Sequence, residues 1–385
     1  MRTPLAHRWR TGLERVCRGV LFASVAIAGG VSSAAAEDEV STLLADNMTK
    51  AEDAKFGFGS GSIIVAPIPL KSPALGNGLI LTGGYLFKLD EGSDTSFIGA
   101  ARMKTSNGSI GTGAAANLSF DDARWSIQAL LGKAKVNYSI YGIGSVRFDP
   151  VPLSQEGDFA RLGFGYGLTD SLSLGIDAQY LDTTIRSAEA GGVQFPNLPG
   201  LDVGVRQVVL GPEITFDTRD DTIYPTGGFY GSFLVQRGIG IGDFDNAFTK
   251  GTAFARTYMP VAENGVLALG ATACRASREA PFFNMCSVGL TDGLRGFAAG
   301  QYIDNALLSA QAEFRYRLGS RWGATVFAGA SMVGANFSDM GAPLYAGGLG
   351  FRFRLSKDFP LDFSVDQTLN SEGDSFTYVY IGQSF

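Results

Sequence analysis

Histidine is almost missing from this sequence. Among its 385 residues the only histidine is His7, which lies in a leader segment that we expect to be removed. A mature chain without an imidazole excludes a Ser-His-Asp triad, a histidine-ligated zinc ion and a histidine general base. We therefore expect a protein that is not an enzyme and that uses no metal or other cofactor.

Charge and long apolar runs are also scarce. Charged residues make up 18% of the chain and aromatic residues 11%, whereas disordered chains are rich in charge and poor in aromatic residues. No run within residues 37–385 reaches the roughly 18 apolar residues that indicate a transmembrane helix. The 52 glycines would destabilise helix interiors. These features exclude a disordered chain, a helical membrane protein and a soluble helical enzyme.

Residues 1–36 have the three parts of a secretory signal peptide. Five arginines accompany one acidic residue in residues 1–19, an apolar run covers residues 20–28, and three alanines end at Ala36. This order of basic, apolar and small residues predicts export and cleavage after Ala36. A membrane anchor is the weaker alternative, because the apolar run is too short to span a bilayer. Residues 37–55 would then be a short acidic periplasmic lead-in, too short for a folded domain.

Removal of the leader would change the charge and the cysteine count. Cleavage would leave 349 residues (385 minus 36) with 26 basic and 36 acidic side chains, a net charge of −10. This balance argues against nucleic acid as a partner, because phosphate binding needs a basic surface. Cys274 and Cys286 remain. In an oxidising compartment this even number predicts a disulfide that closes a short loop.

The mature chain alternates between apolar and polar residues with a period of two. Segments 310–318, 351–355 and 361–366 each place small or apolar side chains on one face and polar or charged ones on the other. In a soluble β-sandwich the apolar face would be the core. In a transmembrane barrel it would face lipid, and the charged face would line the lumen. The barrel is favoured because such segments recur along the whole chain, have about the length of a membrane-crossing strand, and end at Phe385.

The alternation predicts an all-β fold, a 16-stranded antiparallel transmembrane β-barrel over residues 56–385. An even number of strands places both ends of the barrel on the periplasmic side. Alternate connections are then short turns, such as Thr169-Asp170, Gly319-Ser320 and Ser356-Lys357-Asp358. The predicted strands are 56–68, 78–88, 94–104, 109–120, 124–138, 157–168, 171–181, 204–216, 227–238, 249–260, 263–273, 304–318, 321–334, 345–355, 360–369 and 375–385.

Two connections between these strands contain unusual residue combinations. The periplasmic turn after the eighth strand carries Asp217-Thr-Arg219-Asp220 and Pro225-Thr-Gly227-Gly228, which ordinary turn chemistry would also explain. The irregular run 274–303 carries Gly293-Leu294-Arg295-Gly296-Phe297. Long irregular connections in a compact fold are usually functional or disordered. The two cysteines of this run argue against disorder.

The chain resembles the barrel of the BamA/TamA-type outer-membrane protein assembly factors, a family of bacterial surface antigens. The resemblance covers residues 56–385 and rests on these two motifs and on the end of the final strand, 381–385. The resemblance implies that the sixth outer loop folds into the lumen, where Arg295 pairs with an acid on the barrel wall. Glu313, which the alternation places inside, is the expected partner. Arginine suits this role because its guanidinium holds a carboxylate bidentately. The alternative is an Arg295 that simply lies in solvent on an outer loop.

The sequence departs from the family pattern in two ways. Family members usually carry periplasmic POTRA domains before the barrel, and residues 37–55 are too short for one, so the chain resembles a branch that lacks them. The thirteenth strand of the family carries Phe-x-Asp-x-Gly facing the lumen. The best match is Phe327-Ala-Gly329-Ala-Ser331, in which the acid is missing.

Other inward charges on the last strands are expected to form ion pairs: Arg315, Arg317, Arg352 and Arg354 with Asp362 and Asp366.

The seam between the first and last strands is a second candidate site. Pro67 and Pro69 in the first strand cannot donate backbone hydrogen bonds, and prolines in strands are normally confined to edges. The resemblance implies that the barrel opens laterally here, between the first strand and the strand that ends at Phe385. The slightly favoured alternative is that the first strand stops near Ala66 and the prolines begin a loop.

The sequence thus favours an outer-membrane barrel that inserts or translocates proteins, or lipid, through a deformable seam. The expected partners are outer-membrane lipid, unfolded outer-membrane protein clients and a periplasmic protein, and the barrel is expected to be a monomer. The alternative function is a passive porin gated by the sixth loop. An inert surface antigen is a further possibility.

Overall fold

The computed structural model describes residues 61–187, 202–221, 223–355 and 362–384. The predicted signal peptide (1–36), the periplasmic lead-in (37–55), the turn 356–358 and Phe385 lie outside these described residues.

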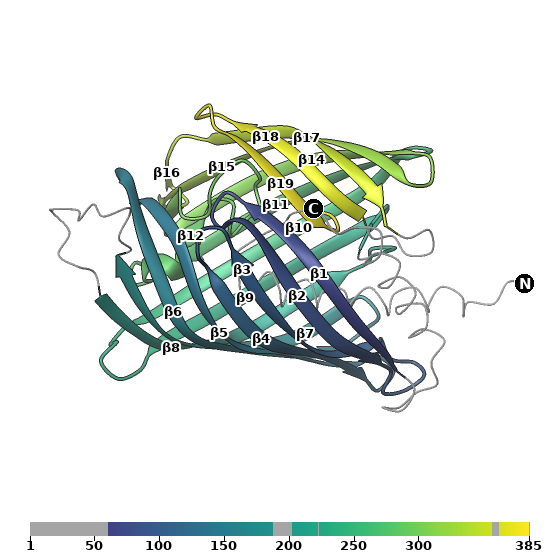
Figure 1. The fold of residues 1–385 in the computed structure, drawn as a ribbon, viewed down its shortest axis with the longest axis horizontal. Helices are drawn as coiled ribbons and strands as arrows, with labels where there is room; N and C mark the ends of the chain where they lie inside the picture. The colour runs from purple at the N-terminus through teal and green to yellow at the C-terminus, as the bar shows by residue number, and fades with distance from the viewer. Residues whose placement is uncertain (1–60, 188–201, 222, 356–361, 385) are drawn as a thin grey trace, which may run out of the picture.

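The described chain forms a closed antiparallel β-barrel of sixteen strands (Figure 1), which confirms the predicted fold class. Each strand pairs with its neighbours in chain order, and the last strand returns to the first. The barrel strands are β1 (Ser62–Ser72), β2 (Gly76–Phe87), β3 (Ser96–Thr105), β4 (Ile110–Phe120), β5 (Trp125–Ile143), β6 (Val146–Gly167), β7 (Leu172–Ser187), β8 (Asp202–Asp217), β9 (Gly228–Gly240), β10 (Ala247–Ala262), β11 (Gly265–Ala276), β14 (Ala306–Leu318), β15 (Trp322–Asn336), β17 (Leu344–Arg354), β18 (Asp362–Asn370) and β19 (Ser375–Ile381).

The remaining elements lie in connections. The short strand β16 (Asp339–Met340) pairs with the end of β15. The connection between β11 and β14 contains the 3-10 helix η1 (Phe282–Asn284) and the short strands β12 (Cys286–Ser287) and β13 (Ile303–Asp304), which pair with each other. Among the described residues, no helix has the length and apolar character needed to cross a membrane.

The two faces of the barrel wall have opposite polarity. Leucine, phenylalanine and isoleucine side chains project outward, and Leu131 (58% exposed) and Leu349 (67%) are examples. The inward face of β14 carries Glu313 and Arg315, which are 0% and 1% exposed. A soluble sheet would bury the apolar face. This inverted arrangement is what a lipid-facing barrel requires.

The largest difference from the predicted strands is the hairpin of β5 and β6. The prediction ended at residue 138 and resumed at 157, whereas the strands continue to Ile143 and from Val146. Pro150 and Pro152 are strand-breaking residues in a sequence-based assignment. The extended hairpin is stabilised by tertiary packing that the sequence does not reveal. Ile140 and Leu153 lie in an apolar cluster with Ile303 of the β11–β14 connection.

The limits of three strands that border the candidate sites also differ from the prediction. β1 covers Ser62–Ser72 and includes both prolines, so the interpretation that a loop begins after Ala66 is wrong. β11 extends to Ala276, which places Cys274 in a strand rather than in the irregular run. β19 ends at Ile381, before the terminal residues that the prediction assigned to it.

Candidate functional site

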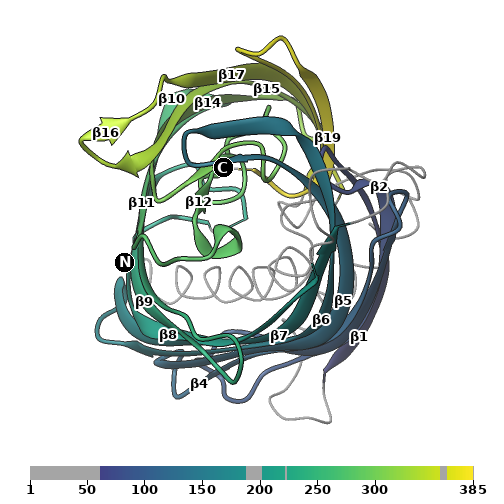
Figure 2. The same ribbon diagram turned by 90° about the vertical axis from the view of Figure 1, so that its left-hand side faces the viewer.

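The connection between β11 and β14, here called the inner loop (residues 277–305), lies inside the barrel. Figure 2 looks along the barrel and shows the β12 segment within the ring of strands. A disulfide joins Cys274 on β11 to Cys286 on β12, with a Cα–Cα distance of 5.9 Å. Both cysteines are fully buried and pack in an apolar cluster with Leu294 and Phe297. The loop is therefore held to the wall covalently as well as by packing.

Arg295 of the inner loop lies between two carboxylates of the barrel wall. Its Nη2 lies 2.5 Å from Glu313 Oε2 on β14, and its Nη1 donates to Asp366 Oδ2 on β18. Both carboxylates are 0% exposed and Arg295 is 6% exposed. Burial alone would lower the pKa of the guanidinium, but the charges of Glu313 and Asp366 outweigh burial and raise it. Arg295 thus stays charged and joins strands that are not neighbours.

The two carboxylates also bind arginines of the wall. Arg315 Nε donates to Glu313 Oε1 at 2.8 Å, and Arg352 Nη1 donates to Asp366 Oδ1 at 2.5 Å. The Tyr380 hydroxyl on β19 donates to Asp366 Oδ2 at 2.6 Å. We call these six side chains the lumen cluster: Arg295, Glu313, Arg315, Arg352, Asp366 and Tyr380.

The residues around Arg295 fix the backbone of the loop. Gly296 has φ +114°, and its N–H donates to the Tyr378 hydroxyl at 2.8 Å. The Asn370 amide donates to the Gly296 carbonyl at 2.7 Å. A Cβ at position 296 would lie only 2.7 Å from Ala346 Cβ. Only glycine meets both the backbone angle and this close approach.

On the thirteenth strand, where the family acid is missing, other residues occupy the space beside that position and contact Arg295. That strand is β15, where Arg295 stacks over the Phe327 ring at 3.5 Å from the ring centroid. The position of the family acid is Gly329, and Leu294 fills the space beside it, because a Cβ there would lie 2.6 Å from Leu294 Cδ1. Asp366 on β18 provides the second carboxylate instead.

Sequence reasoning placed Asp366 in the lumen but did not identify it as a partner of Arg295. It missed Phe327 as a stacking surface and missed Tyr378, Tyr380 and Asn370 altogether. The period-two pattern of the last two strands puts these side chains on the inward face. That signal was available, but it does not say which inward residue the loop contacts.

The turn after β8, predicted to be periplasmic, is built on its acidic residues. Arg219 forms a bidentate pair with Asp217, with distances of 2.8 Å from Nε to Oδ1 and 2.5 Å from Nη2 to Oδ2. Asp220 Oδ1 accepts the backbone N–H groups of Thr226 and Gly227 at 2.9 and 3.0 Å. The turn motif predicted from the sequence thus folds on itself.

The same turn reaches the lumen cluster. Arg315 Nη1 donates to the Pro225 carbonyl at 3.5 Å. The neighbouring Tyr224 ring is buried and lies 4.3 Å from the guanidinium of Arg317 and 5.1 Å from that of Arg354. Both arginines bind Asp362 on β18. Arg315 therefore connects the turn motif to the inner-loop motif through Glu313.

At the other end of the barrel, the β5–β6 hairpin crosses over the inner loop (Figure 2). Arg147 Nη1 donates to the Gln301 carbonyl at 2.6 Å, and its guanidinium lies 3.8 Å from the centre of the Tyr302 ring. The Gly144 N–H donates to the Ile303 carbonyl at 2.9 Å. The inner loop is therefore enclosed by the wall on its sides and by a hairpin above it.

The seam between β1 and β19 contrasts with every other junction of the wall. Within the described strands, the two are joined at one Cα pair, Lys71↔Val379. The β1–β2 ladder has ten such pairs and the β18–β19 ladder seven. At this register only residues 69–72 of β1 lie beside residues 378–381 of β19, so the two strands overlap at four positions and pair at one.

Two prolines of β1 lie next to the paired position: at this register Pro69 would be opposite Ile381, the last residue of β19, and Pro67 opposite Gln383, beyond the end of that strand. In the β1–β2 ladder they lie opposite Leu81 and Leu79. A proline cannot donate, so these must be the non-hydrogen-bonded pairs of an alternating antiparallel ladder. The two nitrogens then point to the β19 side of β1, and at Pro69 an N–H donor is missing where the seam could continue. Phe385, the third residue predicted for the seam, lies outside the described residues.

A sixteen-stranded barrel with a lipid-facing exterior, an inner loop bound to its wall and one weak seam defines an outer-membrane β-barrel with an occupied lumen. Residues 153–374, more than half of the chain, match the Omp85 superfamily domain, and the chain belongs to this superfamily.

Solved structures agree with this fold. The chain is similar to BamA from Haemophilus ducreyi lacking POTRA domains 1–3, with a TM-score of 0.57, 14% identity, and coverage of 84% of this chain and 69% of that one. It is also similar to CdiB from Acinetobacter baumannii (TM-score 0.54, 12% identity, 84% and 59% coverage) and CdiB from Escherichia coli (0.52, 14%, 88% and 70%). No curated protein matches the sequence.

Proposed function

We propose that this barrel inserts or translocates other polypeptides at the outer membrane through the β1–β19 seam. The observation that carries the proposal is the single Cα pair of the seam, in a barrel whose other neighbouring strands share seven or more such pairs. Membership of the Omp85 superfamily and the similarity to BamA and CdiB support it. The clients would be unfolded outer-membrane proteins, and no bond-breaking step or cofactor is needed.

The seam suits this role because it exposes unpaired strand edges. An edge strand presents backbone N–H and carbonyl groups that can pair with an incoming strand. The prolines face the β19 side of β1, so the edge of β19 is the better template for a client strand. A local opening also costs little where few hydrogen bonds must break.

The inner loop would keep its position in the lumen while the seam between β1 and β19 opens. Arg295, Glu313 and Asp366 hold the loop to β14 and β18, so the wall beside β19 keeps its shape while the seam opens. Breaking a buried ion pair by removing one partner typically costs about 3–5 kcal/mol. We infer that the loop stays in the lumen during a cycle and that the seam is the moving part.

A seam lock tests this proposal. Lys71→Cys with Val379→Cys places a disulfide at the paired position, and Ala310→Cys with Ala330→Cys is a matched lock within the continuous β14–β15 ladder. In proteoliposomes supplied with an unfolded outer-membrane protein, the seam lock should abolish client insertion and a reductant should restore it. The control lock should leave insertion unchanged.

Two results would contradict the proposal. One is a seam-locked barrel that inserts clients as fast as the control. The other is a large, steady single-channel conductance that the seam lock leaves unchanged, together with no client insertion. The second result would identify the alternative, a passive porin gated by the inner loop.

A further inference from the structure

The first five strands of the barrel have basic but no acidic side chains among them, as is also true of β9, β10, β11 and β17. The whole chain has a formal net charge of −6, yet within their bounds β1, β2, β3, β4 and β5 contain no aspartate or glutamate. They do contain lysine and arginine. By contrast, β6, β7 and β8 carry eight carboxylates between them: Asp149, Glu156, Asp158, Asp177, Asp182, Asp202, Glu213 and Asp217.

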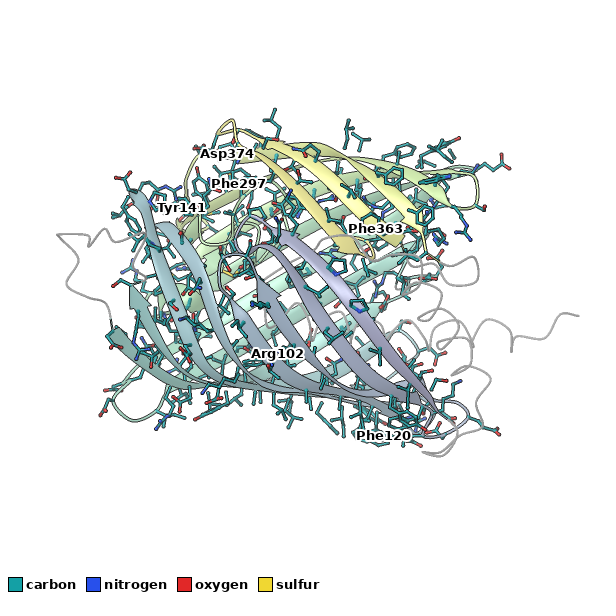
Figure 3. The ribbon with its side chains drawn as sticks, in the orientation of Figure 1. Arg102, Phe120, Tyr141, Phe297, Phe363 and Asp374 are labelled. Carbon is teal, nitrogen blue, oxygen red and sulfur yellow. A yellow bond between two sulfur atoms is a disulfide. The ribbon has the colours of Figure 1, made fainter. Side chains whose placement is uncertain are left out.

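Four of these basic side chains form one cluster on the outer surface, here called the basic patch: Arg102 and Lys104 on β3, and Lys133 and Lys135 on β5. All four are exposed. Figure 3 marks Arg102 on this wall, between the end of the barrel marked by Tyr141 and the end marked by Phe120.

The strand register brings the four residues together. Thr112 on β4 lies opposite both Arg102 and Lys133, and Ile110 lies opposite both Lys104 and Lys135. Neighbouring strands are about 4.8 Å apart and alternate residues on one strand about 7 Å apart. The four Cα atoms therefore mark a parallelogram of about 7 by 10 Å. One multiply charged group could reach all four side chains.

The basic patch has no internal counter-charge. In the part of the chain that the structure describes, none of the four side chains forms an ion pair or a hydrogen bond. The nearest outward carboxylates are Asp158 and Glu156 on β6, opposite Lys133 and Lys135. They border the patch on one side only, and Arg102 and Lys104 lie two strands further away.

The surroundings of the patch are apolar and face the bilayer. Leu81 and Leu79 on β2 lie opposite Arg102 and Lys104 and are 54% and 46% exposed. Leu131, two residues before Lys133, is also exposed. Lysine and arginine at a membrane boundary place their stems along apolar surface and their charged ends in the headgroup layer. The ligand should therefore have both an anionic headgroup and acyl chains.

We propose that the basic patch binds a phosphate-bearing lipid headgroup of the bilayer, with the acyl chains on the leucines beside it. Arginine and lysine both bind phosphate oxygens with charge-assisted hydrogen bonds. Each basic residue near an anionic lipid surface contributes about 1 kcal/mol, which corresponds to about fivefold in affinity. The site lies on the strands that follow β1, so a bound lipid would be close to the seam. It does not depend on the proposed assembly function.

Native mass spectrometry of the mature barrel in detergent tests this site. The probe is diphosphorylated lipid A, compared with the same lipid after removal of its phosphates. Arg102→Gln with Lys104→Gln should weaken binding of the diphosphorylated lipid on the order of twentyfold, and Lys133→Gln with Lys135→Gln should do the same. The control is Arg186→Gln with Arg206→Gln, which removes two outward arginines that are paired with Asp202 and Asp182. It should change binding less than about twofold.

Three results would overturn the site. They are an equal loss in the control variant, equal binding of the lipid without phosphates, and displacement of the lipid by inorganic phosphate at modest concentration. The last would identify a soluble-anion site. If a patch variant folds poorly, binding of diphosphorylated lipid A to the unaltered barrel is measured at rising ionic strength. Binding to the patch must weaken as salt is added, and binding that does not change would overturn the site.

Discussion

The two walls that meet at the seam are stabilised in different ways. The wall of β14, β15, β17, β18 and β19 carries the buried lumen cluster and binds the inner loop through Arg295. The wall of β1 to β5 has no carboxylate in its strands and relies on backbone ladders and small or apolar side chains. Removing one partner from a buried ion network is costly, whereas a ladder can open at its end at little cost. The barrel thus joins a rigid wall to a deformable one.

The largest expected effect is at Glu313, which Arg295 and Arg315 share. Glu313→Gln keeps the shape of the side chain but removes the carboxylate that Arg315 pairs with and one of the two carboxylates beside Arg295. We expect a loss of about 3–5 kcal/mol in the free energy of unfolding, measured by urea denaturation in detergent. Asp182→Asn breaks the exposed pair with Arg206 and is the control, with an expected loss of about 0–1 kcal/mol.

The network also predicts that a charge swap fails. Arg295→Glu with Glu313→Arg would place the new glutamate beside Asp366 and the new arginine beside Arg315. The double variant should be no more stable than either single variant. A double variant with restored stability would mean that Arg295 and Glu313 form an isolated pair rather than part of a network.

The disulfide should have the next largest effect. Replacing Cys274 and Cys286 together by alanine removes a cross-link that closes a 12-residue separation. We expect a loss of about 2–3 kcal/mol, seen as a lower midpoint of thermal unfolding. The same loss should appear in the unaltered protein after reduction. If the double variant were as stable as the unaltered protein, the lumen cluster alone would hold the loop.

Gly296→Ala should have an intermediate effect, because a Cβ at this position meets Ala346 and the backbone angle is positive. We expect a loss of about 1–3 kcal/mol, again by urea denaturation. Gly293→Ala is the matched control. Gly293 also has a positive φ of +70°, but open space surrounds its Cβ position, so the loss there should be about 1 kcal/mol. Equal losses would show that close packing against Ala346 is unimportant.

The smallest effect on stability is expected at the seam. Pro67→Val with Pro69→Val restores two N–H donors on the β19 side of β1, of which the one at position 69 lies beside β19. Each new hydrogen bond contributes about 1 kcal/mol or less. The consequence for function should be larger than the consequence for stability, since a longer β1–β19 ladder opens less often. Client insertion in proteoliposomes should slow while the unfolding midpoint rises slightly. Unchanged insertion would separate the prolines from the function of the seam.

The sequence was sufficient for the architecture because the barrel pattern is local and repeated. Alternation in segments such as 310–318 depends only on which face of a strand meets lipid. The strand limits at the outer end were less predictable. The β5–β6 hairpin extends because Ile140 and Leu153 pack on Ile303, and such a contact between distant segments has no local signature.

The candidate site was predictable in part. The resemblance of the inner-loop motif to that of the assembly-factor family pointed to Arg295, and the alternation along β14 pointed to Glu313. Asp366 was placed in the lumen, but its role depends on the position of Arg295 between β14 and β18, which the register of single strands does not determine. The contact between Pro225 and Arg315 was also missed. It joins two motifs that the sequence presents as unrelated connections.

Backbone amide hydrogen exchange tests the contrast between the walls most directly. In the detergent-solubilised barrel, amides of β1 and β19 that lie at the seam should exchange at least about tenfold faster than those of β14 and β15, because little free energy is needed to open them. The Lys71→Cys, Val379→Cys lock should remove this difference under oxidising conditions. Equally slow exchange in all four strands of the unlocked barrel would contradict a deformable seam beside a rigid wall.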